Sequence, residues 1–176
     1  MLTSQTIYYL QNGVIMKNSK KAFTMIELIF VIVVLGILAA IAVPKMAATR
    51  DDANIAKGRS DIASIRSAIV TERQTRLIQG DNSWINSLSS SSDPLFDGND
   101  TNHTLLMYGI ASGTTDGHWQ TTSASFPYVL YSFKVLGTDN TFTYNPTSAT
   151  ITVGTVSVPA GGFVCTAGAS CDQLTK

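Results

Sequence analysis

Glu27 is the first residue whose chemistry stands out, because it lies at the start of a long apolar segment. From Leu28 to Val43 no residue carries a polar side chain, and Lys20 and Lys21 precede the segment. An ionisable group at membrane depth costs roughly 2.5–3.5 kcal/mol on insertion scales, and such groups are usually functional. A carboxylate in a low-dielectric medium is strongly attracted to a cation. The sequence therefore predicts a charged partner for Glu27.

The segment that positions Glu27 is long enough to cross a membrane as a helix. At about 1.5 Å per residue, a helix over residues 23–43 spans roughly 30 Å, the thickness of one hydrocarbon core. Pro44 follows the apolar run and removes one backbone donor, so we expect a kink there. The lysines before the segment place that end on the cytoplasmic side by the positive-inside rule.

This segment is also compatible with three simpler roles. Thr24 and Glu27 have the spacing of a capping box, in which Glu27 bonds only to its own helix start, and this can coexist with a further role. A plain transmembrane anchor is the second, although it would not need an acid in its first turn. A secretory signal peptide is the third, because Ala40-Ile41-Ala42 resembles a signal-peptidase site. Against it, the apolar run exceeds the usual length of roughly 7–15 residues.

The order of these residues resembles the class III signal of type IV pilins and type II secretion pseudopilins. The features that match are a basic stretch, an aromatic residue, a glutamate at the fifth place, a long apolar run and a proline, here Lys20-Lys21-Ala22, Phe23, Glu27, residues 28–43 and Pro44. In that family a prepilin peptidase cuts before the aromatic residue, here Phe23, and methylates the new amine. Ala22 departs from the family pattern, which usually has glycine before the cut, and this puts the efficiency of cleavage in question.

The resemblance also implies a role for Glu27. In the family this glutamate pairs with the methylated amine of a neighbouring subunit, here that of Phe23, and so sets the axial register of a fibre. Gly36 and Pro44 bracket a weak stretch of the helix that, by the same resemblance, can unwind when the fibre stretches. The expected partners are other pilin or pseudopilin subunits in a helical polymer, the prepilin peptidase and the inner-membrane assembly platform.

The function implied is that of a structural subunit of a type IV pilus-like, type II secretion or competence fibre. The expected location is the bacterial inner membrane, crossed once with the head in the periplasm, and then the fibre itself. The resemblance does not distinguish a surface pilus from a secretion or DNA-uptake system, nor a major subunit from a minor one. The alternative function is a periplasmic or secreted binding protein or enzyme, released by signal peptidase after Ala42.

We expect four regions along the chain. Residues 1–22 are a leader, 23–44 the transmembrane and assembly helix, 45–80 its amphipathic continuation, and 81–176 a β-rich head with a C-terminal disulfide loop. Residues 1–16 carry no charge, whereas a compact basic leader begins at Met16. We therefore hypothesise that Met16 is the true start, which the codons of Gly13 and Val14 would test. A longer leader is the alternative.

The expected fold is α+β and pilin-like, with one long helix packed on a small antiparallel sheet. After Pro44, apolar residues recur at helical spacing at Ile55, Ile62, Ile65, Ala68 and Ile69. We expect this stripe to pack on the head and the helix to stop at Gly80. Residues 82–104 read as loop, and 126–136, 141–144 and 149–153 as strands separated by short turns. Such strands predict an antiparallel meander.

Cys165 and Cys171 are the only cysteines in the chain. In an envelope compartment we expect a disulfide that closes a short C-terminal loop, with Gly168 allowing the turn. Many pilins close a C-terminal loop in this way, so the resemblance favours the same pairing. A metal site that used these two cysteines as ligands would lack suitably placed histidines. Redox catalysis would need the closer spacing of a C-x-x-C motif.

Residues 97–104 form a polar motif with two overlapping N-x-T sequons, at Asn99 and Asn102. Asp97 and Asp100 precede these asparagines by two positions, so the motif resembles the extended acceptor of bacterial N-glycosylation. Oxygens of Asp97, Asn99 and Asp100 could instead bind calcium, as in major pseudopilins, although the spacing is not that of an EF-hand. A solvated turn is the third alternative. No other metal or cofactor is expected.

The sequence gives little support for an enzyme. The two histidines, His103 and His118, lie in polar loop-like stretches, and no G-x-S-x-G, P-loop or H-E-x-x-H motif occurs. We expect the His118-Trp119 pair to be at the surface or partly packed. The 12 basic and 12 acidic residues balance, but the basic ones fall mostly before residue 77. The mildly acidic head argues against direct nucleic-acid binding.

Overall fold

The computed structural model describes residues 23–98, 105–123 and 129–176. The chain divides into two units, one ending at Val43 and the other beginning at Pro44. Its elements are α1 (Met25–Ile78), β1 (Trp119–Ser123), β2 (Val129–Val135), β3 (Thr138–Tyr144), β4 (Ile151–Val153), β5 (Val156–Val158), β6 (Phe163–Ala167) and α2 (Cys171–Thr175). The expected α+β class is confirmed.

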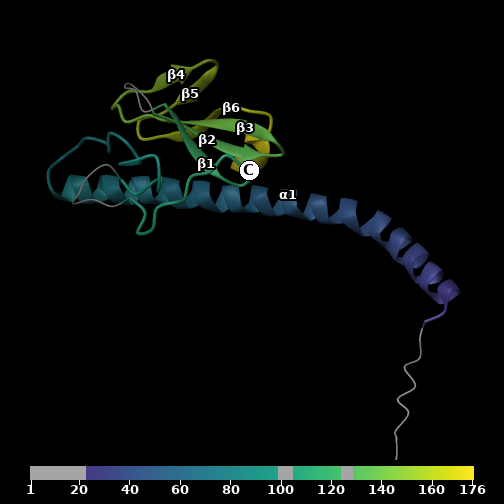
Figure 1. Ribbon diagram of the computed structural model, residues 1–176. Coiled ribbons are helices and arrows are strands. Elements are labelled where there is room, and N and C mark those ends of the chain that lie inside the picture. The colour runs from purple at the N-terminus through teal and green to yellow at the C-terminus, as the bar shows by residue number, and fades with distance from the viewer. Residues whose placement is uncertain (1–22, 99–104, 124–128) are drawn as a thin grey trace, which may run out of the picture. The chain divides into compact units, whose positions relative to one another are not determined.

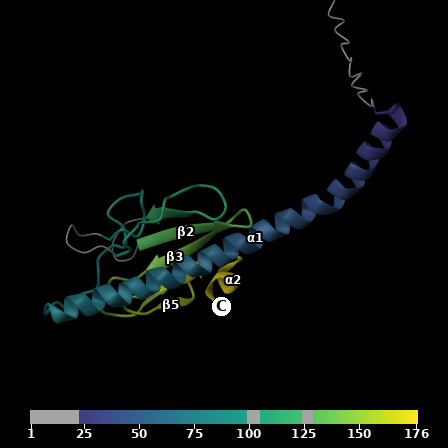
Figure 2. The same cartoon turned by 90° about the horizontal axis from the view of Figure 1, so that it is seen from below.

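The head is built on a four-stranded antiparallel sheet with the order β1-β2-β3-β6. β2 and β3 form a hairpin in which Val129 lies opposite Tyr144 and Val135 opposite Thr138. β6 pairs with the other edge of β3. The part of α1 that belongs to the head crosses one face of this sheet (Figures 1 and 2). One long helix on an antiparallel sheet is the architecture that the sequence predicted.

The expected isoleucine stripe of α1 packs into the head. Ile62, Ile65 and Ile69 are at most 2% exposed, and Ile55 and Ala68 are partly buried against the same core. Their spacing of three and four residues puts them on one face of the helix. Burial of that face against the sheet confirms the predicted packing.

α1 also stops where the sequence predicted. Gly80 has a φ of 86°, its amide donates to the carbonyl of Leu77 at 3.1 Å, and the amide of Asp81 donates to the carbonyl of Arg76 at 2.9 Å. These two bonds form the Schellman pattern of a helix C-terminus. Glycine adopts the required positive φ without a Cβ clash.

Trp119 lies at the centre of the core, although the sequence suggested that it would be at most partly packed. Its side chain is fully buried, and its indole Nε1 donates to Asp61 Oδ2 on α1 at 3.0 Å. Its ring packs against four phenylalanines of the core, Phe96, Phe133, Phe142 and Phe163. The expectation was wrong because β1 begins at this residue and turns the ring toward α1.

The predicted meander does not continue into residues 149–153. β4 pairs only with β5 in a separate two-stranded sheet, and the neighbour of β3 is β6. Asn145 explains this difference, because its Nδ2 donates to the carbonyls of Ala149, Val158 and Pro159 at 2.8, 3.0 and 3.1 Å. These bonds hold both ends of the β4–β5 hairpin at one point, so the chain leaves the main sheet after β3 and rejoins it as β6.

The long loop after α1 is irregular, as expected, but it adds to the core. Leu88, Leu95 and Phe96 are fully buried. The loop closes on itself, since the amide of Gly98 donates to the carbonyl of Leu88 at 3.0 Å and that of Phe96 to Ser89 Oγ at 2.8 Å. Its described part is therefore a packed element of the head.

Candidate assembly site

The start of α1 holds Glu27 in a capping box. Thr24 Oγ1 accepts a hydrogen bond from the amide of Glu27, and Glu27 Oε2 accepts from the amide and the hydroxyl of Thr24, each at 3.2 Å. This reciprocal pattern satisfies two backbone donors that have no partner inside the helix. Both bonds to the carboxylate use Oε2, and no described residue bonds Oε1. The capping role is therefore present and leaves one carboxylate oxygen for another donor.

Phe23 stands directly before the capping residue, and its side chain is 79% exposed. A cut before Phe23 would create an amine at the N-terminal end of α1, one residue before Thr24. Ala22, on the other side of the predicted cut, lies outside the described residues. Such a cut would therefore put a new positive charge at the same helix end as the Glu27 carboxylate.

The N-terminal unit exposes its apolar side chains on every side. Every described residue from Phe23 to Val43 is exposed, including large residues such as Phe30, at 68%, and Ile41, at 67%. A helix that is apolar all round belongs in a membrane or among other helices. Within the described part of the chain, α1 is the one helix long and apolar enough to cross a membrane.

Gly36 and Pro44 both lie inside a continuous helix. Proline has no amide proton, so the carbonyl of Ala40 loses its usual helical bond at this point. A Cβ added to Gly36 would meet no atom within 4 Å. Nothing in the described part of the chain therefore requires glycine at this position, and such a requirement would come from another chain packed against it.

The N-terminal segment is also what the chain shares with known proteins. Residues 17–43 match the family described as the prokaryotic N-terminal methylation motif. The chain is 52% identical over 48 residues to the type IV narrow pilus major component PilA5 of Thermus thermophilus. It is 40% identical over 53 residues to the type II secretion system core protein G of Klebsiella michiganensis. The N-terminal segment of the chain therefore carries the motif shared by type IV pilins and type II secretion pseudopilins.

The similarity of the chain to these relatives covers only part of each protein. It covers 27% of this chain and 41% of the Thermus protein, and 30% and 37% for the Klebsiella protein. The core protein G of Pseudomonas aeruginosa is 38% identical with the same coverage of 30% and 37%. The chain thus spans about two fifths of the length of these curated relatives. No solved structure matches it.

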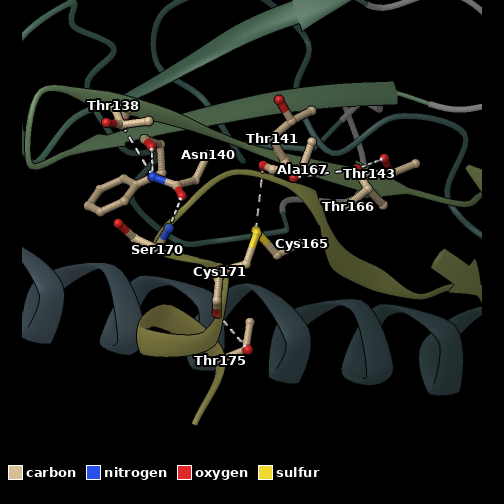
Figure 3. Close-up of a disulfide and its surroundings, with 11 residues drawn as sticks. Thr138, Asn140, Thr141, Thr143, Cys165, Thr166, Ala167, Ser170, Cys171 and Thr175 are labelled. Carbon is tan, nitrogen blue, oxygen red and sulfur yellow. Dashed lines mark hydrogen bonds between the residues drawn. A yellow bond between two sulfur atoms is a disulfide. The ribbon is translucent and has the colours of Figure 1, made fainter. Parts of the chain in front are cut away.

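The C-terminal loop of the chain is closed by the expected disulfide between Cys165 and Cys171 (Figure 3). Cys165 lies on β6 and Cys171 begins α2, with 5.7 Å between their Cα atoms. The amide of Ser170 donates to Asn140 Oδ1 at 2.8 Å. The side-chain amide of Asn140 donates to two carbonyls of the β2–β3 hairpin, at 3.3 and 3.2 Å. Asn140 therefore ties the loop to the sheet independently of the disulfide.

Replacing both Cys165 and Cys171 with serine is expected to lower the free energy of unfolding of the head by about 2–3 kcal/mol. A short closed loop removes conformational entropy from the unfolded chain by about that amount. The bonds of Asn140 should keep the loop docked in the variant. Urea unfolding of the full chain in detergent measures the change, and an unchanged midpoint would contradict it.

Much of the predicted sequon and calcium motif lies outside the described residues, namely Asn99, Asp100, Asn102 and His103. Asp97 is described, and its carboxylate accepts hydrogen bonds from the amide of Ser90, at 2.9 Å, and from its hydroxyl. Asp97 therefore helps to hold the loop. In the described part of the chain, no group of three histidine, cysteine or acidic residues is placed to hold a metal. Glycosylation and calcium binding stay predictions.

The sequence did not predict that side chains of β2 and α2 pack tightly against the backbone of α1 at Gly58. A Cβ at Gly58 would lie 2.6 Å from Phe133 Cε1 and 2.8 Å from Leu174 Cδ2. Beside it, Arg59 Nε donates to the carbonyl of Gln173 on α2 at 2.6 Å. The sequence signal was a glycine inside a helical pattern, which indicates a packing constraint without identifying the neighbour.

Proposed function

We propose that this chain is a structural subunit of a type IV pilus-like fibre or of a type II secretion or competence pseudopilus. The observation that carries the proposal is the N-terminal part of α1, which exposes apolar side chains on all sides and has Glu27 in its first turn, four residues after Phe23. A membrane before assembly, and neighbouring helices in the fibre, would each cover these side chains. The similarity to a narrow pilus major component and to core protein G supports the proposal.

Processing would prepare the helix for assembly. A prepilin peptidase would cut between Ala22 and Phe23 and methylate the new amine. The processed chain would stay inserted in the bacterial inner membrane, with its head in the periplasm. The assembly platform would then extract it from the membrane and add it to the fibre. Its work would be mechanical, with no catalytic step and no direct contact between the head and nucleic acid.

Glu27 would set the register of each added subunit. Inside its own chain, the carboxylate uses Oε2 for the capping box. The methylated Phe23 amine of a neighbouring subunit would bond to Oε1. In a low-dielectric fibre core two opposite charges attract strongly, whereas either charge alone is unfavourable. Only the axial step that brings both together would therefore be stable.

The N-terminus of the purified protein tests this proposal. Mass spectrometry is expected to find a chain that begins with N-methylated Phe23. A chain that begins at Val43 would instead identify a protein released by signal peptidase after Ala42, and a chain still carrying Ala22 would contradict processing. As a matched control, Ala22→Gly restores the usual family residue and should raise the processed fraction or leave it complete.

A further inference from the structure

Three charged residues recur at intervals of seven along α1, shortly after Pro44. They are Lys45, Asp52 and Arg59, so their charges alternate from positive to negative to positive. Seven residues make nearly two helical turns and advance the helix by about 10.5 Å, with a drift of about 20° around its axis. The three residues therefore form one stripe along the helix, which we call the charged stripe. All three side chains are exposed.

The charged stripe has no ion pair within the described part of its own chain, where the ion pairs join Arg76 to Glu72 and to Asp81. Opposite charges on a helix surface usually pair at a spacing of three or four residues. At those spacings from the members of the stripe, the chain has only alanine, isoleucine and threonine. The helix therefore does not neutralise these charges itself, which points to a partner on another molecule.

Arg59 is held at its place in the stripe and keeps donors for such a partner. Its Nε donates to the carbonyl of Gln173 on α2 at 2.6 Å. This bond uses one of the five N–H donors of the guanidinium. A carbonyl oxygen has no net charge, so the bond orients Arg59 without neutralising it.

An open groove of about 480 Å³ lies along the stripe at Asp52 and Arg59. Its lining also includes Ile55, Ala56 and Gln173. The distance at which two helices pack depends on the side chains at the contact, and the short side chain of Ala56 lets a second helix come close. The groove therefore has room for a charged side chain of another molecule between an acid and a base.

A second, parallel copy of this chain carries the charges that match the stripe. If that copy is displaced by seven residues along the helix, its Lys45 lies level with Asp52 of the first copy. Its own Asp52 then lies level with Arg59 of the first copy. Without the displacement, each charge would meet its own kind. Copies that cross one membrane with the same end in the cytoplasm are parallel, so the membrane supplies the required orientation.

We propose that the charged stripe joins copies of this chain at an offset of seven residues, with Asp52 of each copy between Lys45 of one neighbour and Arg59 of the other. Where the stripe faces the axis of a fibre, the neighbours on both sides reach it. Each contact between successive subunits then contains two ion pairs. The inference rests on the proposed function, because only a fibre gives every copy two such neighbours.

The stripe adds a second determinant of register to Glu27. The bond between Glu27 and the Phe23 amine of a neighbour displaces that neighbour in the same direction, by about four residues or 6 Å. The offset of the stripe is about 10.5 Å. The long side chains of Lys45 and Arg59 span the difference of about 4.5 Å, so both contacts form at one axial step.

Charge reversal in the bacterium that makes the fibre tests this pairing. Asp52→Lys replaces two attractions with two repulsions at each contact and should weaken each addition step roughly tenfold. Adding Lys45→Asp to this variant restores one of the two pairs and should recover part of the fibres. Arg50→Asp, at an exposed basic residue of α1 outside the stripe, is the matched control and should assemble like the wild type. The mass of sheared fibres, relative to the chain in the membrane fraction, measures the effect.

Cysteine cross-linking measures the offset itself. The two native cysteines are joined to each other, so added cysteines react only between copies. A disulfide needs Cα atoms roughly 4.4–6.8 Å apart. In the double variant Lys45→Cys, Asp52→Cys, these positions of successive subunits meet, and mild oxidation should link chains into a ladder on a denaturing gel. Either single variant should cross-link at least tenfold less, because equal positions lie about 10.5 Å apart along the axis.

The outcomes separate this inference from the proposed function. Wild-type amounts of fibre from Asp52→Lys would overturn the charged stripe and leave the fibre itself intact. Single-cysteine variants that cross-link as well as the double variant would overturn the offset. A wild-type chain that forms no fibres would contradict the proposed function, and the inference with it.

Discussion

Glu27→Ala is expected to leave the chain in the membrane and to abolish its assembly into fibres. The apolar run after Glu27 is unchanged in this variant, so insertion does not depend on the carboxylate. In a fibre, however, the amine of Phe23 would lose its counter-charge. An uncompensated charge at membrane depth costs roughly 2.5–3.5 kcal/mol, which weakens each addition step roughly a hundredfold. Membrane fractionation and electron microscopy of sheared fibres measure the two effects.

Two control variants separate the charge of Glu27 from its capping role. Glu27→Gln keeps an oxygen for the capping box, in which glutamine also serves, but removes the charge. Thr24→Ala breaks the two capping bonds that use the Thr24 hydroxyl and keeps the charge. If charge sets the register, the first variant should form no fibres and the second should form them. Normal fibres from Glu27→Gln would show that capping alone explains the residue.

The parts of the fold that the sequence predicted are those governed by local patterns. The isoleucine stripe of α1 follows from helical periodicity, and the stop at Gly80 from the preference of glycine for positive φ. The pairing of Cys165 with Cys171 needs only an oxidising compartment and a short loop. The segment around Glu27 is likewise continuous along the chain, so the order of its residues alone is enough to recognise it.

What the sequence did not predict depends on contacts between distant residues. Trp119 lies in a polar stretch, and only its bond to Asp61, 58 positions earlier, and its phenylalanine neighbours place it in the core. The exit of the chain from the sheet depends on Asn145, whose side chain bonds carbonyls up to 14 positions away.

Trp119→Ala is expected to be the most damaging single change in the head, lowering its free energy of unfolding by roughly 3–5 kcal/mol. The side chain is fully buried, so truncation leaves a cavity among the phenylalanine rings that surround it. Small domains are stable by roughly 5–15 kcal/mol, so this loss would unfold part of the population. Urea unfolding of the full chain, followed by near-ultraviolet circular dichroism, measures it. Trp84→Ala, at a half-buried tryptophan, is the control and should cost less.

The bond between Trp119 and Asp61 is tested by its pH dependence. Burial raises the pKa of Asp61, against the opposing effects of the Trp119 bond and of Lys57. A carboxyl with a raised pKa in the folded state adds stability that is complete below its unfolded pKa of about 3.9 and is lost as pH rises through the folded value. Trp119→Phe removes one opposing effect, so the folded-state pKa of Asp61 should rise further, and the loss of stability, which still begins near the unfolded pKa, should extend to higher pH. Asp61→Asn should abolish this contribution to the pH dependence of the free energy of unfolding. An identical pH profile in wild type, Trp119→Phe and Asp61→Asn would show that the indole does not change the pKa of Asp61.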